Sequence, residues 1–99
     1  MEFESSAQSW LEAQARELHS TNRINEAIEI LRGVLAARLN HQGEKHFQTI
    51  NSRSELARCL RTAREYDECF VLYSENIRIH RGKFGDEHPQ TLRSLSRLA

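Results

Sequence analysis

The most constraining feature of this sequence is a motif that occurs twice, beginning at Gly43 and again at Gly85. Gly43–Ile50 reads GEKHFQTI, and Gly85–Leu92 reads GDEHPQTL. Gly, His, Gln and Thr recur in the same order, with an acidic residue after each Gly and an aliphatic residue after each Thr. Self-similarity at a fixed period predicts a repeat protein, in which each unit packs mainly on its neighbours.

The shift that superimposes Gly43 on Gly85 also aligns residues outside the motif. Identical residues pair at several further places: Ala15 with Ala57, Arg16 with Arg58, Leu18 with Leu60, Glu26 with Glu68, Leu56 with Leu98 and Ala57 with Ala99. The repeat therefore extends over most of the 99 residues. A chain of this length forms one small domain with a thin core.

Apolar residues recur at spacings of three and four, which is typical of amphipathic helices. Helix-forming residues dominate the composition and strand signals are almost absent. One stripe contains Ile24, Ala27, Ile28, Leu31, Val34, Leu35 and Leu39, and its counterpart one unit later contains Phe70, Leu72, Tyr73, Ile77 and Ile79. The other helix type carries Phe47, Ile50, Leu56, Ala57 and Leu60. We expect helices near residues 5–21, 24–40, 47–63, 66–82 and 89–99.

The joints near residues 20–24 and 62–66 are too short for anything but antiparallel hairpins. Two hairpins and the first helix of a third make an all-α fold, a short α-solenoid of about two and a half repeats. We expect a single domain over residues 1–99. Its repeats would cover about residues 5–42 and 43–84, followed by a half repeat over 85–99.

In this architecture the recurring motif marks the boundary between repeats. Glycine can adopt positive φ, so Gly43 and Gly85 are expected to end the preceding helix. Pro89 suits the first turn of a helix and keeps His88 out of the α-conformation. Phe47 stands in place of Pro89 in the earlier copy, and we expect the helix to begin there without that constraint.

The stretches LARCLRTAREYDEC and FGDEHPQTLRSLSRLA resemble the 42-residue tetratricopeptide repeats (TPR) of the kinesin light chain type. The resemblance covers about residues 10–99 and is most specific over 84–99. It implies a right-handed superhelix whose first helices line a concave groove that binds proteins. Where that family has a turn glycine, this chain has Asn22 and Arg64, and Cys69 replaces the alanine of the second helix.

Composition and spacing argue against several other functions. Lys plus Arg and Asp plus Glu both count 14, so no bulk field draws nucleic acid, and no apolar run is long enough for a membrane span. The histidines and Cys59 and Cys69 lack the paired spacing of zinc ligands. No nucleophile or phosphate-loop motif is present, so we expect no enzyme activity, no cofactor and no metal. We expect a cytoplasmic protein with reduced cysteines.

The polar face of the first helices is the candidate binding surface. Arg16 and Arg58 occupy the same place in consecutive units, and arginine makes forked contacts with carboxylates. We therefore hypothesise a groove for an extended, acidic segment of a partner protein. The expected contacts are Arg16, His19, Asn51, Arg58, Arg61 and Arg93. The alternative is a solvated face laced with pairs such as Arg58 with Glu55 or Arg61 with Glu65.

The last expected helix suggests a second function. Leu92, Leu95 and Leu98 form a stripe with no following helix to complete the hairpin. An uncovered apolar flank of a solenoid is extended by more repeats, by a partner or by self-association. The chain could therefore act as an oligomerisation module, and light scattering would distinguish this from binding to a different protein.

Overall fold

The structure is a computed structural model, and it describes residues 5–84. These residues form four helices: α1 (Ser5–Ser20), α2 (Ile24–Gln42), α3 (Phe47–Thr62) and α4 (Tyr66–Phe84). The four helices expected in this range are found, and their ends lie within two residues of the expected ones. The helix expected at 89–99 lies outside the described residues.

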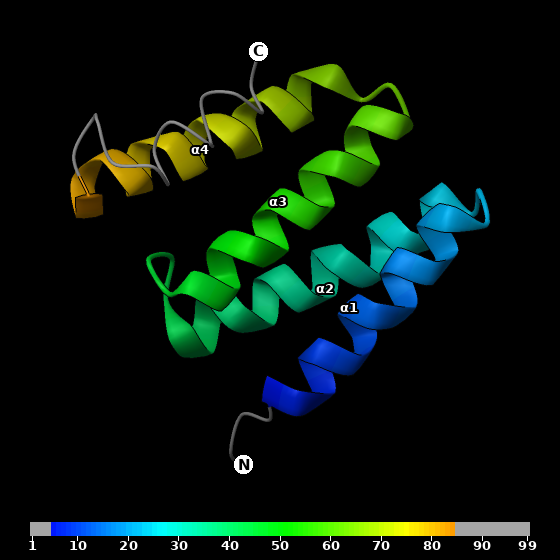
Figure 1. Cartoon of the computed structure of the whole chain (residues 1–99), viewed down its shortest axis with the longest axis horizontal. Helices are drawn as coiled ribbons and strands as arrows, with labels where there is room; N and C mark the ends of the chain where they lie inside the picture. The colour runs from blue at the N-terminus through cyan, green and yellow to red at the C-terminus, as the bar shows by residue number, and fades with distance from the viewer. Residues whose placement is uncertain (1–4, 85–99) are drawn as a thin grey trace.

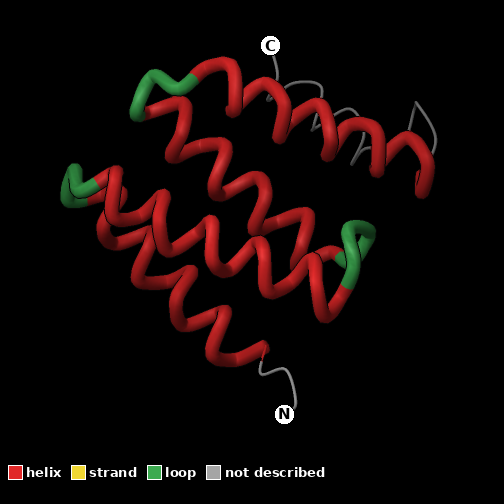
Figure 2. Tube along the Cα trace, turned by 180° about the vertical axis from the view of Figure 1, so that it is seen from behind, coloured by secondary structure: helices red, strands yellow, loops and turns green. Residues whose placement is uncertain are grey.

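The helices pack in chain order, α1 on α2, α2 on α3 and α3 on α4, as Figure 1 shows. The two short turns lie at one end of the layer and the longer α2–α3 loop at the other, so that consecutive helices are antiparallel (Figure 2). This arrangement confirms the all-α solenoid of hairpins. It also leaves α1 and α3, the first helices of the two hairpins, on the same side of α2.

Both short turns use the same helix-ending geometry. Asn22 and Arg64 have φ of 66° and 65°. After α1, the N–H of Asn22 donates to the carbonyl of His19, and the N–H of Arg23 donates to that of Leu18. Equivalent bonds follow α3 at the same place in the next repeat. This is a Schellman motif, in which a left-handed residue reverses the chain and satisfies the last carbonyls of the helix.

The α2–α3 loop has the role expected for the motif. Gly43 has φ 86° and its N–H donates to the carbonyl of Arg38, which closes α2. His46 has an extended backbone, and its ring Nδ1 accepts a hydrogen bond of 3.1 Å from the N–H of Gln48. Helix α3 then begins at Phe47. The first copy of the motif therefore ends α2 and begins α3, as expected, and the second copy lies outside the described residues.

Small residues recur in the core of the helix packing. Ala15 and Ala57, one repeat apart, are both fully buried, and so is Ala27 at the start of α2. Cys69 occupies the position of Ala27 in the second unit and is also buried. Around them the core cluster contains Ile28, Leu31, Leu35, Leu56, Leu60 and Tyr73.

Three of the expected core residues are exposed instead. The prediction is wrong for Leu39, which is 39% exposed, for Phe47, which is 64% exposed, and for Phe70, which is 59% exposed. Phe47 is the first residue of α3 and stacks on the ring of His46 at 4.9 Å between centroids, outside the core. The counterpart of Phe70 one repeat earlier, Ile28, is 6% exposed. The same place in the repeat is therefore buried in the first hairpin and exposed in the second.

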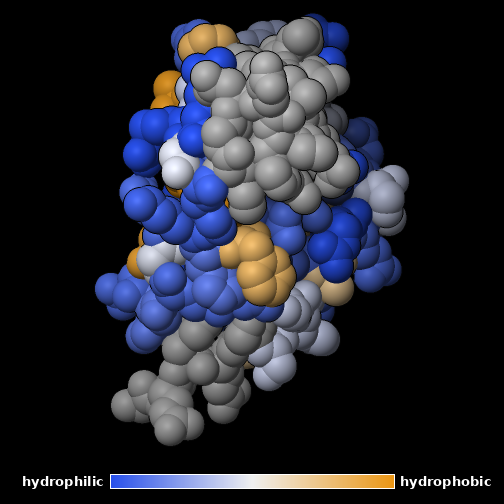
Figure 3. All heavy atoms as spheres, turned by 60° about the vertical axis from the view of Figure 1, so that its left-hand side comes forward, coloured by the Kyte–Doolittle hydropathy of each residue, from blue (hydrophilic) through white to orange (hydrophobic). Residues whose placement is uncertain are grey.

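The described surface is largely polar. Figure 3 shows a face on which hydrophilic residues predominate, with small separate hydrophobic areas among them. Within residues 5–84, none of the helices combines the length and the apolar character needed to cross a bilayer.

Candidate functional site

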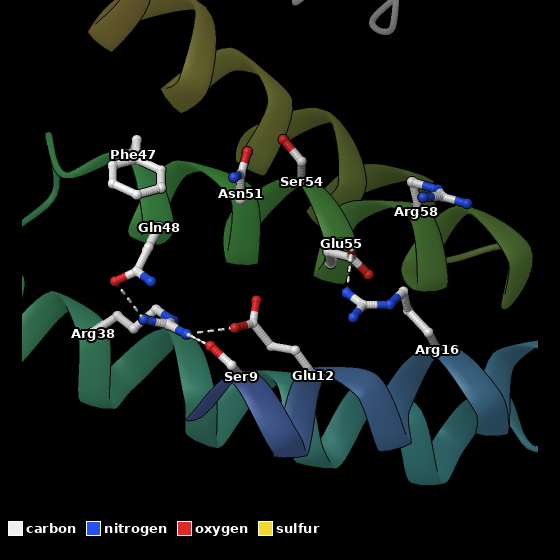
Figure 4. Close-up of a pocket in the computed structure, with 10 residues that line it drawn as sticks. All are labelled: Ser9, Glu12, Arg16, Arg38, Phe47, Gln48, Asn51, Ser54, Glu55 and Arg58. Carbon is white, nitrogen blue, oxygen red and sulfur yellow. Dashed lines mark hydrogen bonds and ion pairs between the residues drawn. The ribbon is translucent and has the colours of Figure 1, made fainter. Parts of the chain in front are cut away.

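A groove of about 290 Å³ opens between α1 and α3 (Figure 4). Its two walls come from equivalent helices of the two units, and Arg38 of α2 lies at its floor. The lining is mostly polar or charged: Ser9, Glu12, Arg16, Arg38, Phe47, Gln48, Asn51, Ser54, Glu55 and Arg58. Such a surface suits an extended polar chain better than an apolar small molecule.

The floor is held by a buried ion pair. Arg38 is only 1% exposed, and its Nη2 lies 2.5 Å from Oε1 of Glu12, which is also buried. The other carboxylate oxygen of Glu12 accepts a hydrogen bond of 2.9 Å from the hydroxyl of Ser52. Since Glu12, Arg38 and Ser52 come from α1, α2 and α3, this cluster sets the spacing of the three helices below the groove.

Two glutamines and Ser9 also accept hydrogen bonds from the guanidinium, the contact with Ser9 Oγ being 3.4 Å. Nη1 of Arg38 donates to Oε1 of Gln42 and to Oε1 of Gln48, both at 3.1 Å. The amide nitrogen of Gln42 donates to Gln48 at 2.7 Å, so the two side chains are locked together. A buried charge with this many partners is strongly oriented, because losing one partner would leave a desolvated group unsatisfied.

Two further contacts join α1 to α3, one across the groove and one beyond it. Nη1 of Arg16 lies 3.3 Å from Oε1 of Glu55, and Figure 4 shows these side chains reaching toward each other. Nearer the end of α1, the ring Nε2 of His19 is 2.9 Å from the hydroxyl of Thr62. Together with the Glu12–Ser52 bond, they form a ladder between the first helices of the two units.

The structure brings together three of the six residues expected in the groove. Arg16, Asn51 and Arg58 line it. His19 joins the ladder beyond it, and Arg61 lies exposed in the last turn of α3; neither is among the lining residues. Arg93 lies outside the described residues, as do Leu92, Leu95 and Leu98, which were expected to mediate self-association.

Sequence reasoning missed the buried pair of Glu12 and Arg38. A signal for Arg38 was present, because it continues the apolar stripe of α2 three and four residues after Leu35 and Val34. A charge placed on a core stripe is usually buried against a partner. No comparable signal pointed to Glu12, since its counterpart in the next repeat is Ser54.

The second hairpin has a different polar cluster. Arg53 Nη1 donates to Asn76 at 3.0 Å, and the Asn76 amide donates to the hydroxyl of Ser54 at 2.8 Å. Burial lowers the pKa of Arg53, although Glu75 and Glu44 oppose that shift. These bonds fix α4 against α3 and therefore hold the wall of the groove that carries Asn51 and Arg58.

Few side chains among residues 5–84 have properties suited to catalysis. Within residues 5–84, no group of three or more His, Cys, Asp or Glu side chains could hold a metal ion. Cys59 and Cys69 carry free thiols and are buried, and burial raises the pKa of each. A buried thiol of raised pKa forms little thiolate and is a poor nucleophile.

Antiparallel helix pairs that recur at a fixed period, with a groove between their first helices, define an α-solenoid of TPR-like repeats. A solved structure from Podosopora anserina, described as putative kinesin light chain nearly identical TPR-like repeats, has this fold. It superposes on 96% of this chain with a TM-score of 0.89 and 25% sequence identity. The present chain spans 45% of that structure's length.

Sequence comparison adds nothing to this result: no family model and no curated protein matches the chain. The structural similarity bears out the resemblance inferred from the repeat motif. Solenoids of this kind are in general scaffolds for protein–protein interaction rather than enzymes.

Proposed function

We propose that this chain is a non-catalytic module that binds a segment of another protein in the groove between α1 and α3. The single observation that carries the proposal is the groove itself, whose floor is an oriented, buried ion pair and whose rim presents Asn51 and Arg58 to solvent. A preformed polar groove lowers the entropic cost of binding an extended chain.

The dimensions of the groove suit a short peptide. Phe47 and Arg58 stand at opposite ends of the groove wall on α3, and the helical rise puts them about 16 Å apart along the axis. An extended peptide covers that length with about five residues. Asn51 would bond the peptide backbone, and Arg58 would bind a carboxylate, with Arg16 as a further contact. His19, Arg61 and Arg93 are proposed only as contacts for a longer segment.

We further propose a cytoplasmic location, which fits a chain whose two cysteines both carry buried free thiols. The overall charge of zero gives no support for a membrane or a nucleic acid as the partner. The proposed partner is therefore a protein segment, and its charge is the property to test first.

The test compares two fluorescein-labelled decapeptides, one of alternating Ser and Glu and one of alternating Ser and Lys. We expect the Glu peptide to bind and the Lys peptide not to bind, and we expect affinity to fall as salt rises. Arg16→Ala/Arg58→Ala should weaken binding about tenfold. The matched control is Arg23→Ala/Arg64→Ala, which removes the same charge from the exposed turns. Equal effects of the two double variants would refute the groove assignment.

A second function, self-association, is favoured by a different observation. Tyr66, Phe70 and Val71 are all more than half exposed on α4, whereas Ile28, the counterpart of Phe70, is buried within the array. An exposed apolar face at a position that is buried one repeat earlier is a candidate surface for a second copy. Leu92, Leu95 and Leu98 remain candidates for the same contact.

Light scattering over a dilution series tests self-association. We expect Phe70→Glu to abolish any dimer, because it places a charge in the apolar contact. Phe47→Glu is the matched control, since Phe47 is equally exposed on a different helix. A parent protein that is monomeric at every concentration would exclude this function.

A further inference from the structure

We propose that Glu55 determines which arginine of the groove accepts a carboxylate from a partner. The Glu55 carboxylate neutralises Arg16 inside the groove and so directs the partner's acidic residue to Arg58. This inference rests on the proposed function, because it assigns the specificity of the same groove.

The geometry places an acidic side chain where a partner's acid would otherwise bind. Glu55 extends from α3 and its carboxylate contacts the guanidinium of Arg16 on the opposite wall, 3.3 Å away. The Arg16 side chain is 55% exposed and that of Glu55 is 21% exposed, so the pair lies at the solvent-facing level of the groove. An incoming carboxylate must therefore compete with Glu55 for the charge of Arg16.

The third lining arginine is not available to replace Arg16. Arg38 is bound by Glu12 and both glutamines beneath the groove and is almost fully buried. Within residues 5–84, Arg58 makes no ion pair. Of the three arginines that line the groove, Arg58 therefore has the charge open to an external carboxylate.

The acidic residue at position 55 is particular to the second unit. In the next unit, the position of Glu55 is taken by Arg97 and the position of Asn51 by Arg93. The positions that are acidic and neutral in the second unit are thus basic in the sequence of the third. The counterpart of Glu55 in the first unit is Ala13, so the second unit alone carries an acidic residue at this position.

Two effects of Glu55 on an acidic peptide act in the same direction. The internal pair competes with the peptide for the charge of Arg16, and the Glu55 carboxylate repels acids that bind nearby. Exposed ion pairs of this kind are weak, so we expect removal of the Glu55 charge to tighten binding about fivefold. A purely structural role would instead leave affinity unchanged and lower stability slightly.

The experiment is a double-mutant cycle with the labelled Ser-Glu decapeptide as probe. Glu55→Gln should tighten binding about fivefold, and adding Arg16→Gln should remove that gain. In the parent, Arg58→Gln should weaken binding severalfold and Arg16→Gln by less than about twofold. Glu29→Gln, an exposed change of the same charge on α2, controls for net charge.

Each outcome is decisive. A gain in Glu55→Gln that depends on Arg16 supports the proposal, including the case in which the parent itself binds too weakly to measure. If the parent binds but Glu55→Gln behaves like Glu29→Gln, or its gain persists without Arg16, the role of Glu55 is overturned and the groove function stands. Absence of binding by every variant overturns both.

Discussion

Asn22 and Arg64, which stand exactly one repeat apart, share the same left-handed backbone conformation, with φ of 66° and 65°. Each occupies the left-handed position of a Schellman motif between the two helices of a hairpin. Kinesin-light-chain-type repeats use glycine at this place, which the present chain lacks in both units. The hydrogen-bonding demand of the turn therefore determines the conformation even when the residue does not favour it.

Replacing Arg64 by glycine should stabilise the protein. A residue with a Cβ is strained at positive φ, and relief of that strain exceeds the added chain entropy of glycine, so we expect a gain of about 1 kcal/mol. Asn22→Gly should change stability by less than about 0.5 kcal/mol, because asparagine tolerates this region. Urea unfolding measures both. A loss of stability in Arg64→Gly would contradict the explanation.

Removing one partner of the buried pair should be costly. Arg38→Met leaves the Glu12 carboxylate buried without its counter-ion, and we expect a loss of about 3 kcal/mol in the free energy of unfolding. Glu12→Leu/Arg38→Met should lose clearly less than Arg38→Met alone, since no charge remains buried. Arg16→Gln, which breaks an exposed pair, is the control and should cost about 1 kcal/mol or less. Equal losses in the Arg38 and Arg16 variants would show that burial is irrelevant.

Acidification should remove the contribution of the Arg32–Glu68 pair to the free energy of unfolding. The two side chains join α2 to α4 through paired hydrogen bonds, one of them 2.8 Å between Nη2 and Oε2. The hydrogen bond from Arg32 lowers the pKa of Glu68 below its ordinary value, against a smaller effect of burial. A carboxyl group whose pKa is lowered by folding stabilises the fold at pH values above its pKa in the unfolded chain, which is about 4.3. This stabilisation is lost as the pH falls through the pKa of the group in the folded protein.

The measurable consequence is a difference between the parent and Glu68→Gln. The parent should be more stable by about 1 kcal/mol or less near neutral pH, because the pair is partly exposed. This difference should vanish in acid and shrink at high salt. Urea unfolding at several pH values provides the test, and a difference that stays constant with pH would contradict it.

The two thiols should be protected in the native state. Cys59 and Cys69 are buried with raised pKa values, so a thiol reagent at mildly alkaline pH should react roughly tenfold or more slowly than in denaturant. Cys69→Ala should preserve the fold, because its counterpart Ala27 fits the same kind of site. Rapid labelling of the folded protein would show that the α3–α4 hairpin opens readily.

Much of the fold could be predicted because its signals are local. The recurrence of Gly43, His46 and Thr49 one unit later revealed the period, and spacings of three and four revealed the helices. Short joints then required antiparallel hairpins. These inferences depend on backbone geometry and on which residues lie on one face of a helix, and both can be read from neighbouring positions in the chain.

The candidate site was only partly predictable. Arg16 and Arg58 drew attention because they recur, and both line the groove. Their environments differ, because Arg16 contacts Glu55 while Arg58 makes no ion pair within residues 5–84. The sequence suggested Glu55 as a partner for Arg58, its neighbour on the same helix. In the packed structure, Glu55 contacts Arg16 on a different helix.

By itself, the sequence determined the repeat, the helices, their antiparallel order and the end of a helix at Gly43. The tertiary structure alone decided that Arg38 is buried against Glu12, that Phe70 is exposed while Ile28 is not, and that Glu55 faces Arg16. The reason is physical. Helix formation follows from interactions within a few residues, but burial and ion pairing depend on side chains far apart in the chain that meet only when the hairpins stack.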